Sequence, residues 1–246
     1  GLGDVYKRQF IGNVEPSTRS VSTALNANLA SLFTGGAPTL TSAEIKEVND
    51  AYAKMTSINC YRNIDEAVRN KTSYAGTIFL DDTYASAYFR KGSLAFPPYG
   101  ILASSMEHEF IHMYQRDVQG KKVDTDKEKR DTGMMEFELA FYQGIIRYIH
   151  AGYSWTFKGE DGDPSYQSLW TSGLTDPSLI PQYEREFQTY VASICANGKP
   201  TSIDINEFVK WSNIFGEYSR GYSGKGYKFG NYDYGTSCIN SLLKLY

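Results

Sequence analysis

Two histidines and a glutamate in the middle of the chain have the types and spacing that zinc chemistry requires. His108, Glu109 and His112 form the pattern H-E-x-x-H. On a helix, residues four apart lie on one face, so both imidazoles can reach one metal ion. Glu109 lies about 100° round the same helix, where its carboxylate can contact a water on that metal. The stretch therefore predicts a zinc site with an acid–base glutamate beside it.

The third protein ligand of this site is predicted to be a carboxylate. Catalytic zinc usually has three protein ligands and an open position for water. A form of the motif that ends in a third histidine needs glycine and histidine where this chain has Gln115 and Val118. His150 is the only other histidine in the chain, and we interpret it as a surface or helix-end residue. Glu136 and Glu138, which follow in an apolar helix-prone stretch, are then the candidates.

The surroundings of Glu136 and Glu138 favour opposite assignments. Glu136 shares a helical stripe with Gln143 and Arg147, which is the composition of a solvated face. Glu138 has mainly apolar neighbours, and a buried carboxylate needs a partner such as a metal. Residues two apart on a helix point in different directions, so only one of the two is expected to bind the metal directly. The other is expected to hydrogen-bond a ligand histidine.

The sequence resembles the gluzincin peptidases, in which H-E-x-x-H is followed by a second helix that donates a glutamate. The resemblance covers roughly residues 75–150 and rests on strands before the motif helix, the motif itself, and an E-x-E helix about two dozen residues later. Many members have Asp or Asn four residues after the ligand glutamate. Aligned on that pattern, Glu136 is the ligand, with Glu138 as the alternative, and Ala140 replaces the supporting acid.

The resemblance implies a fold, a cofactor and a reaction. The expected fold is α+β and zincin-like, with a small antiparallel or mixed sheet packed on the motif helix and a mainly helical C-terminal part. The expected cofactor is Zn²⁺ on His108, His112 and Glu136. The expected reaction is peptide-bond hydrolysis, with Glu109 as general base on a zinc-bound water. A strand beside the site usually pairs with the extended substrate, and residues 93–96 are the predicted strand.

Two alternatives to a general peptidase remain open at this stage. The same chemistry could belong to a secreted toxin or effector protease domain of a larger chain, or the chain could be a non-catalytic zincin-fold binding module. Glu109 counts against the binding module, because a structural zinc site needs no general base and usually has four protein ligands. The oxyanion of the transition state needs a donor besides zinc. Tyr114 and Tyr142 are near in sequence, but both are expected to be packing residues.

The composition is that of a globular protein, and the resemblance implies a peptide or protein substrate as its partner. Apolar residues make up 41% and charged residues 22%, and the net charge of −3 gives no electrostatic case for nucleic acid or an anionic membrane. No apolar run is long enough to span a membrane. Twenty tyrosines, many beside Gly, Asn and Ser, favour a secreted or cell-surface bacterial protein. Cys60, Cys195 and Cys238 fit either one disulfide and a thiol or three thiols.

The N-terminal residues are expected to lie outside the catalytic domain. Residues 1–9 lack an initiator Met and a signal peptide and look like an assembly remnant, so the natural N-terminus is expected to be missing. Residues 1–38 are assigned to this start and a linker with one short helix. The zincin-like catalytic domain is assigned to residues 39–246, with the sheet and motif helix in 39–120 and a mostly helical part in 121–246.

The elements that must position the site are predicted along this domain. Thr41 and Glu44 form a capping box before a helix over residues 42–56, and a second helix passes through 64–68. Further predicted elements, in chain order, are strands over 75–80, 85–89 and 93–96 with a hairpin between the last two, the motif helix from 99 or 100 to about 117, a solvated loop over 120–131, helices over 133–151, 179–196, 205–218 and from 237, and a Gly/Tyr-rich loop over 222–235.

Overall fold

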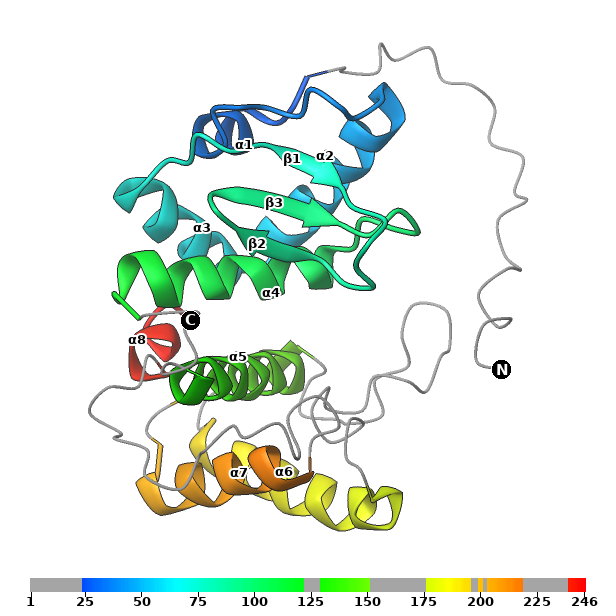
Figure 1. Cartoon of the computed structure of the whole chain (residues 1–246). Helices are drawn as coiled ribbons and strands as arrows, with labels where there is room; N and C mark the ends of the chain where they lie inside the picture. The colour runs from blue at the N-terminus through cyan, green and yellow to red at the C-terminus, as the bar shows by residue number, and fades with distance from the viewer. Residues whose placement is uncertain (1–23, 122–128, 151–175, 196–198, 201–202, 219–238) are drawn as a thin grey trace, which may run out of the picture.

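The computed structural model describes residues 24–121, 129–150, 176–195, 199–200, 203–218 and 239–246 (Figure 1). Within these residues the protein is α+β, with a small mixed sheet and mostly helices, as predicted. No helix of the described part is long and apolar enough to cross a membrane. The elements are α1 (Ala27–Leu32), α2 (Ser42–Thr56), α3 (Asn59–Lys71), β1 (Ile78–Leu80), β2 (Tyr88–Arg90), β3 (Ser93–Phe96), α4 (Ala103–Met113), η1 (Tyr114–Val118), α5 (Lys129–His150), η2 (Pro177–Leu179), α6 (Ile180–Ile194), α7 (Ile205–Tyr218) and α8 (Ile239–Leu243).

Residues 24–38 are part of the packed body, which corrects the linker predicted there. Leu29 and Leu32 of α1 are at most 1% exposed. The backbone N–H of Thr34 donates to the carbonyl oxygen of Tyr74 at 2.8 Å, so the segment after α1 is bonded to the chain just before β1. The predicted short helix is present, and the burial of its apolar side chains makes it part of the core. Residues 1–23 lie outside the described part.

Helix α2 begins and ends where the sequence predicts. The N–H of Thr41 donates to Oε2 of Glu44 at 2.7 Å, and the N–H of Glu44 donates to Oγ1 of Thr41 at 3.3 Å, which confirms the capping box. Helix α3 is longer than the short helix predicted through residues 64–68. The hydroxyl of Tyr52 on α2 donates to Oδ2 of the buried Asp65 on α3 at 2.8 Å. This bond and the apolar contacts around it join the two helices.

The three strands form a sheet in the order β1-β3-β2, with β1 parallel and β2 antiparallel to β3. The hairpin between β2 and β3 turns at Lys91 and Gly92, whose φ angles of 50° and 78° lie in the left-handed region. The predicted hairpin is therefore confirmed. The central position of β3 contradicts the prediction that residues 93–96 pair with substrate, because both edges of that strand are already bonded within the sheet.

Helix α4 lies at the centre of the molecule, between the sheet and α5 (Figure 1). It begins at Ala103, three to four residues later than predicted, and continues directly into the π-helical turn η1. In this turn the N–H of Gln119 donates to the carbonyl oxygen of Tyr114 at 3.0 Å, five residues back. The helical stretch therefore ends close to the predicted residue 117, but its last turn is wider than an α-helix.

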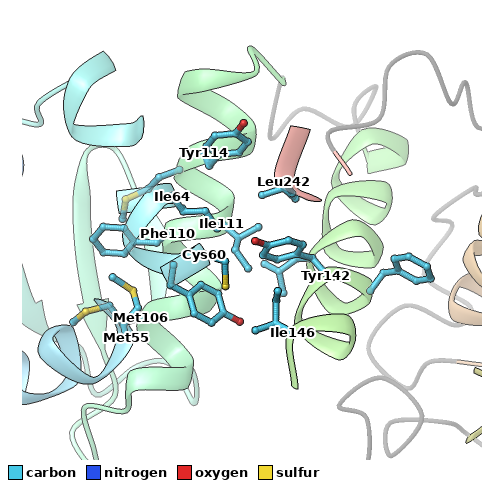
Figure 2. Packing of buried hydrophobic residues seen from close by; sticks show 14 of the residues in the cluster. Met55, Cys60, Ile64, Met106, Phe110, Ile111, Tyr114, Tyr142, Ile146 and Leu242 are labelled. Carbon is cyan, nitrogen blue, oxygen red and sulfur yellow. The ribbon is translucent and has the colours of Figure 1, made fainter. Parts of the chain in front are cut away.

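Helix α5 connects the two halves of the structure, since it contacts α4 and α8 on one side and α6 and α7 on the other (Figure 1). Figure 2 shows Tyr142 and Ile146 of α5 facing Cys60 and Ile111, with Leu242 of α8 beside them. Helix α5 begins at Lys129, four residues before the predicted start, and α6, α7 and α8 fall within the predicted ranges. The predicted loop over 222–235 and most of the predicted loop over 120–131 lie outside the described residues.

Candidate metal centre

The apolar face of α4 determines where its two histidines point. Met106, Phe110 and Met113 are completely buried, and the ring of Phe110 lies 6.2 Å from the ring of Tyr52 on α2. His108 and His112 are on another side of the helix, with side chains 36% and 18% exposed. Burying the apolar face against α2 and α3 therefore turns both imidazoles toward α5.

Glu136 of α5 meets the two histidines. The Nε2 atoms of His108 and His112 are 3.1 Å apart. Glu136 places Oε1 3.2 Å from Nε2 of His112 and Oε2 3.6 Å from Nε2 of His108. Ligands about 2.0–2.1 Å from a tetrahedral zinc lie roughly 3.3 Å from one another. The three side chains thus have the donor types and the mutual spacing that fit zinc.

Glu138, the alternative third ligand, lies away from this group of donor atoms. It is 1% exposed, in agreement with its apolar neighbours in the sequence. Its Oε2 accepts a hydrogen bond from Nε2 of Gln115 at 3.1 Å. This buried carboxylate is therefore bonded to an amide of η1, whereas Glu136 is the glutamate grouped with His108 and His112.

Gln115 is the residue of the site that the sequence analysis does not single out. Its Oε1 lies 2.9 Å from Nδ1 of His112, and its Nε2 also donates to the backbone oxygen of Met135 at 3.0 Å. A hydrogen-bonded chain thus runs from His112 through Gln115 to Glu138. The signal available in the sequence is the spacing of three between His112 and Gln115, which places the two side chains on one side of a helix.

Glu109 is buried between α4 and β2, at the edge of the histidine pair. Its Oε1 lies 3.9 Å from Nε2 of His108, and the residue is 5% exposed. Burial raises the pKa of this carboxyl to about 7, Glu136 adds to the rise, and His112 and the backbone N–H of Phe89 oppose it. A carboxyl with its pKa near neutrality can both accept and release a proton under ordinary conditions.

The two histidines have pKa values shifted in opposite directions. Burial and the neighbouring His112 lower the pKa of His108 to about 4. Burial also disfavours the charge on His112, but Glu136 outweighs it and raises the pKa of that imidazole to about 9. The lowered pKa of His108 favours the neutral form that a metal ligand must have, whereas a cation has to displace the proton that Glu136 favours on His112.

Three further residues of the described part, Tyr142, Tyr114 and Ala140, take no direct part in this group of atoms. Tyr142 is completely buried in the core, and Tyr114 is 4% exposed and accepts a hydrogen bond from Gln119 at 3.1 Å. Both are packing residues, as expected. Ala140, one turn after Glu136, offers only a methyl group. His150 is the last residue of α5, and its side chain is outside the described part.

Comparison with known proteins finds no relative. No protein-family model, no curated protein and no solved structure matches this chain. The assignment of a function therefore rests on the residues of the site.

Proposed function

We propose that the protein is a zinc-dependent peptidase of the gluzincin type that hydrolyses peptide bonds. One observation carries the proposal: the donor atoms of His108, His112 and Glu136 converge, and Glu109 lies beside them. Two imidazoles and a carboxylate are a donor set of catalytic zinc, which keeps one position for water. A structural zinc usually has four protein ligands and gives no reason to bury Glu109 at the edge of the site.

Each side chain of the site has a distinct role in this proposal. Zinc, when bound by His108, His112 and Glu136, supplies a Lewis acid that polarises a carbonyl and lowers the pKa of water. The carboxylate of Glu109 accepts the proton of the attacking water and returns it to the leaving amine. Glu109 lies beside the grouped donor atoms, with its Oε1 3.9 Å from Nε2 of His108, which is the position that both transfers require.

Strand β2, rather than β3, is the candidate partner of an extended substrate. It is an outer strand of the sheet and contacts α4. The backbone N–H of Phe89, in the middle of β2, acts on Glu109 and lowers the pKa of its carboxyl, so this side of the strand faces the site. Within the described residues no strand pairs with that side. An extended peptide can add to such an edge by backbone hydrogen bonds, which would bring its carbonyl groups past the metal.

The test compares the parent protein with Glu109→Gln. We expect one zinc per parent chain and cleavage of some members of a broad peptide and protein panel. Glu109→Gln is expected to keep the zinc but to lose at least about 100-fold in cleavage rate. A variant that cleaves as fast as the parent would contradict the mechanism.

Glu107→Gln is the matched control for this experiment. Glu107 is also a buried glutamate of α4, and burial raises the pKa of its carboxyl to about 6, but its neighbours are Arg147 and Tyr61 rather than the histidines. The Glu107→Gln variant should cleave the panel as fast as the parent does. Zinc binding without cleavage of any panel member would favour a binding module, and cleavage of one protein alone would favour a toxin or effector protease.

A further inference from the structure

Gln115 is held in one orientation by two hydrogen bonds from its amide nitrogen. The residue is 0% exposed, in the π-helical turn η1. Its Nε2 donates to the backbone oxygen of Met135 at 3.0 Å and to Oε2 of Glu138 at 3.1 Å. A carbonyl oxygen can only accept a hydrogen bond, so the nitrogen of the amide must be the atom that faces Met135. Oε1 of Gln115 is therefore the atom that faces His112.

This orientation selects one tautomer of His112. Oε1 of Gln115 lies 2.9 Å from Nδ1 of His112, and an amide oxygen can only accept. Nδ1 must then carry a proton, both in the imidazolium and in the neutral ring that remains when a cation displaces the other proton. In a neutral imidazole the other nitrogen keeps its lone pair. That nitrogen, Nε2, lies 3.1 Å from Nε2 of His108 and 3.2 Å from Oε1 of Glu136.

Both acids of the E-x-E helix thereby serve the same site from different directions. Glu136 faces the histidines, and Glu138, about 200° further round α5, lies behind Gln115. The gluzincin pattern would place a supporting acid at Ala140, which has only a methyl group. The hydrogen bonds from Glu138 through Gln115 support the imidazole of His112 instead, at its Nδ1 atom.

We infer that Gln115, held in place by Glu138, is a positioning residue that fixes the tautomer and the ring plane of His112 for metal binding. The inference rests on the proposed function, since it takes His112 as a zinc ligand. Metal-binding histidines usually donate their second ring N–H to a carboxylate, a backbone carbonyl or a water. Here a side-chain amide accepts that hydrogen bond, and the carboxylate orients the amide.

The first test measures zinc affinity by competition with a chelator. Gln115→Met keeps a similar side-chain volume but removes the acceptor for Nδ1 of His112, and it is expected to bind zinc about 10–100-fold more weakly than the parent. Gln143→Met is the matched control, because Gln143 is 1% exposed on α5 and lies beside Tyr61. The control should bind zinc as the parent does. Equal affinities of Gln115→Met and the parent would overturn the inference.

A second test exchanges the amide of Gln115 and the carboxylate of Glu138. It does not depend on the folding of Gln115→Met. Gln115→Glu alone places two carboxylates together and should weaken zinc binding. Adding Glu138→Gln removes the second carboxylate, so that the carboxylate at position 115 can accept from His112 and the amide at position 138 can donate to it; only the hydrogen bond to the backbone oxygen of Met135 is not restored. We expect the double variant to recover at least about tenfold in zinc affinity over Gln115→Glu. No recovery would overturn the inference.

The same measurements distinguish this inference from the proposed function. Tight zinc binding by the parent without cleavage of any substrate overturns the peptidase proposal alone. Zinc binding that is as tight in Gln115→Met as in the parent overturns the positioning role alone. A parent protein that binds no zinc overturns both.

Discussion

Oε1 of Glu136 lies 3.2 Å from Nε2 of His112, whereas Glu138, two residues further along α5, bonds to Gln115 instead. This relationship predicts different effects of two equivalent substitutions. Glu136→Gln removes a charged ligand and should lower zinc affinity by more than about 100-fold, while Glu138→Gln should lower it by less than about tenfold. Zinc titrations of the two variants measure the difference. Equal losses would show that the two acids share the metal.

Burial of Glu109 predicts a pH dependence of stability in the metal-free protein. The pKa of its carboxyl is about 7 in the folded state and 4.5 in the reference state, so the folded state holds this proton over the range between them. The contribution of this carboxyl to stability should therefore be lost as the pH rises from about 4.5 to about 7. Glu109→Gln has no such proton. The free energy of unfolding of this variant, relative to that of the parent, should therefore rise by about 2 kcal/mol between pH 5 and pH 8.

Urea unfolding with a chelator present measures this change. Glu47→Gln on the exposed side of α2 is the control, because the same substitution at a solvated position should leave the pH profile as it is in the parent. An advantage of Glu109→Gln that is the same at pH 5 and pH 8 would mean that the carboxyl is not desolvated in the folded protein.

The parts of the site that depend on local spacing could be predicted from the sequence. The separation of His108 and His112 by one turn determines that both face one side of α4, whatever the rest of the fold is. The capping box at Thr41 and Glu44 and the hairpin turn at Gly92 are equally local. For these features the residue types by themselves predict the structure that is observed.

The parts that depend on contacts between distant segments could not be predicted in the same way. Whether Glu136 or Glu138 faces the histidines is decided by the rotation of α5, which follows from packing on both of its sides. The order of the strands places β3 in the middle, although the sequence of residues 93–96 fits an edge or a central strand equally well. Gln115 of η1 is oriented by its hydrogen bonds to α5, so its role depends on the packing of these two elements. The sequence of neither segment alone predicts that packing.

The buried cysteines predict a lack of thiol reactivity in the native protein. Cys60 and Cys195 are free, which excludes a disulfide between them. Burial raises the pKa of Cys60 to about 12 and that of Cys195 to about 11. Because the thiolate is the reactive form, neither should be alkylated by iodoacetamide at pH 8 in the folded state.

Mass spectrometry of the alkylated protein checks this expectation. Cys238 lies outside the described residues, so the measurement uses a Cys238→Ser background. Both remaining thiols should be alkylated once guanidinium unfolds the chain. Rapid labelling of Cys60 in the native protein would contradict the packing of α3 against α5, where Cys60 faces Tyr142 (Figure 2).

Phe137 joins α5 to the C-terminal helices and thereby holds the helix that carries Glu136. Its ring is completely buried and lies 5.0 Å from the ring of Phe208 and 5.6 Å from that of Phe215, both on α7. Phe137→Ala should lower the free energy of unfolding by about 3–5 kcal/mol, because it removes buried apolar surface and leaves a cavity. Urea denaturation of the metal-free protein gives this quantity from the shift of the midpoint.

Leu102→Ala is the control for Phe137→Ala, since Leu102 is 59% exposed just before α4 and its truncation should change stability by less than about 0.5 kcal/mol. The two variants also separate stability from metal binding. Neither substitution removes an atom that could bind the metal. If the remaining contacts of α5 hold the helix in place, folded Phe137→Ala should therefore bind zinc as the parent does. A loss of zinc affinity in the folded variant would show that the aromatic cluster of α5 and α7 determines the rotation of α5 and hence the position of Glu136.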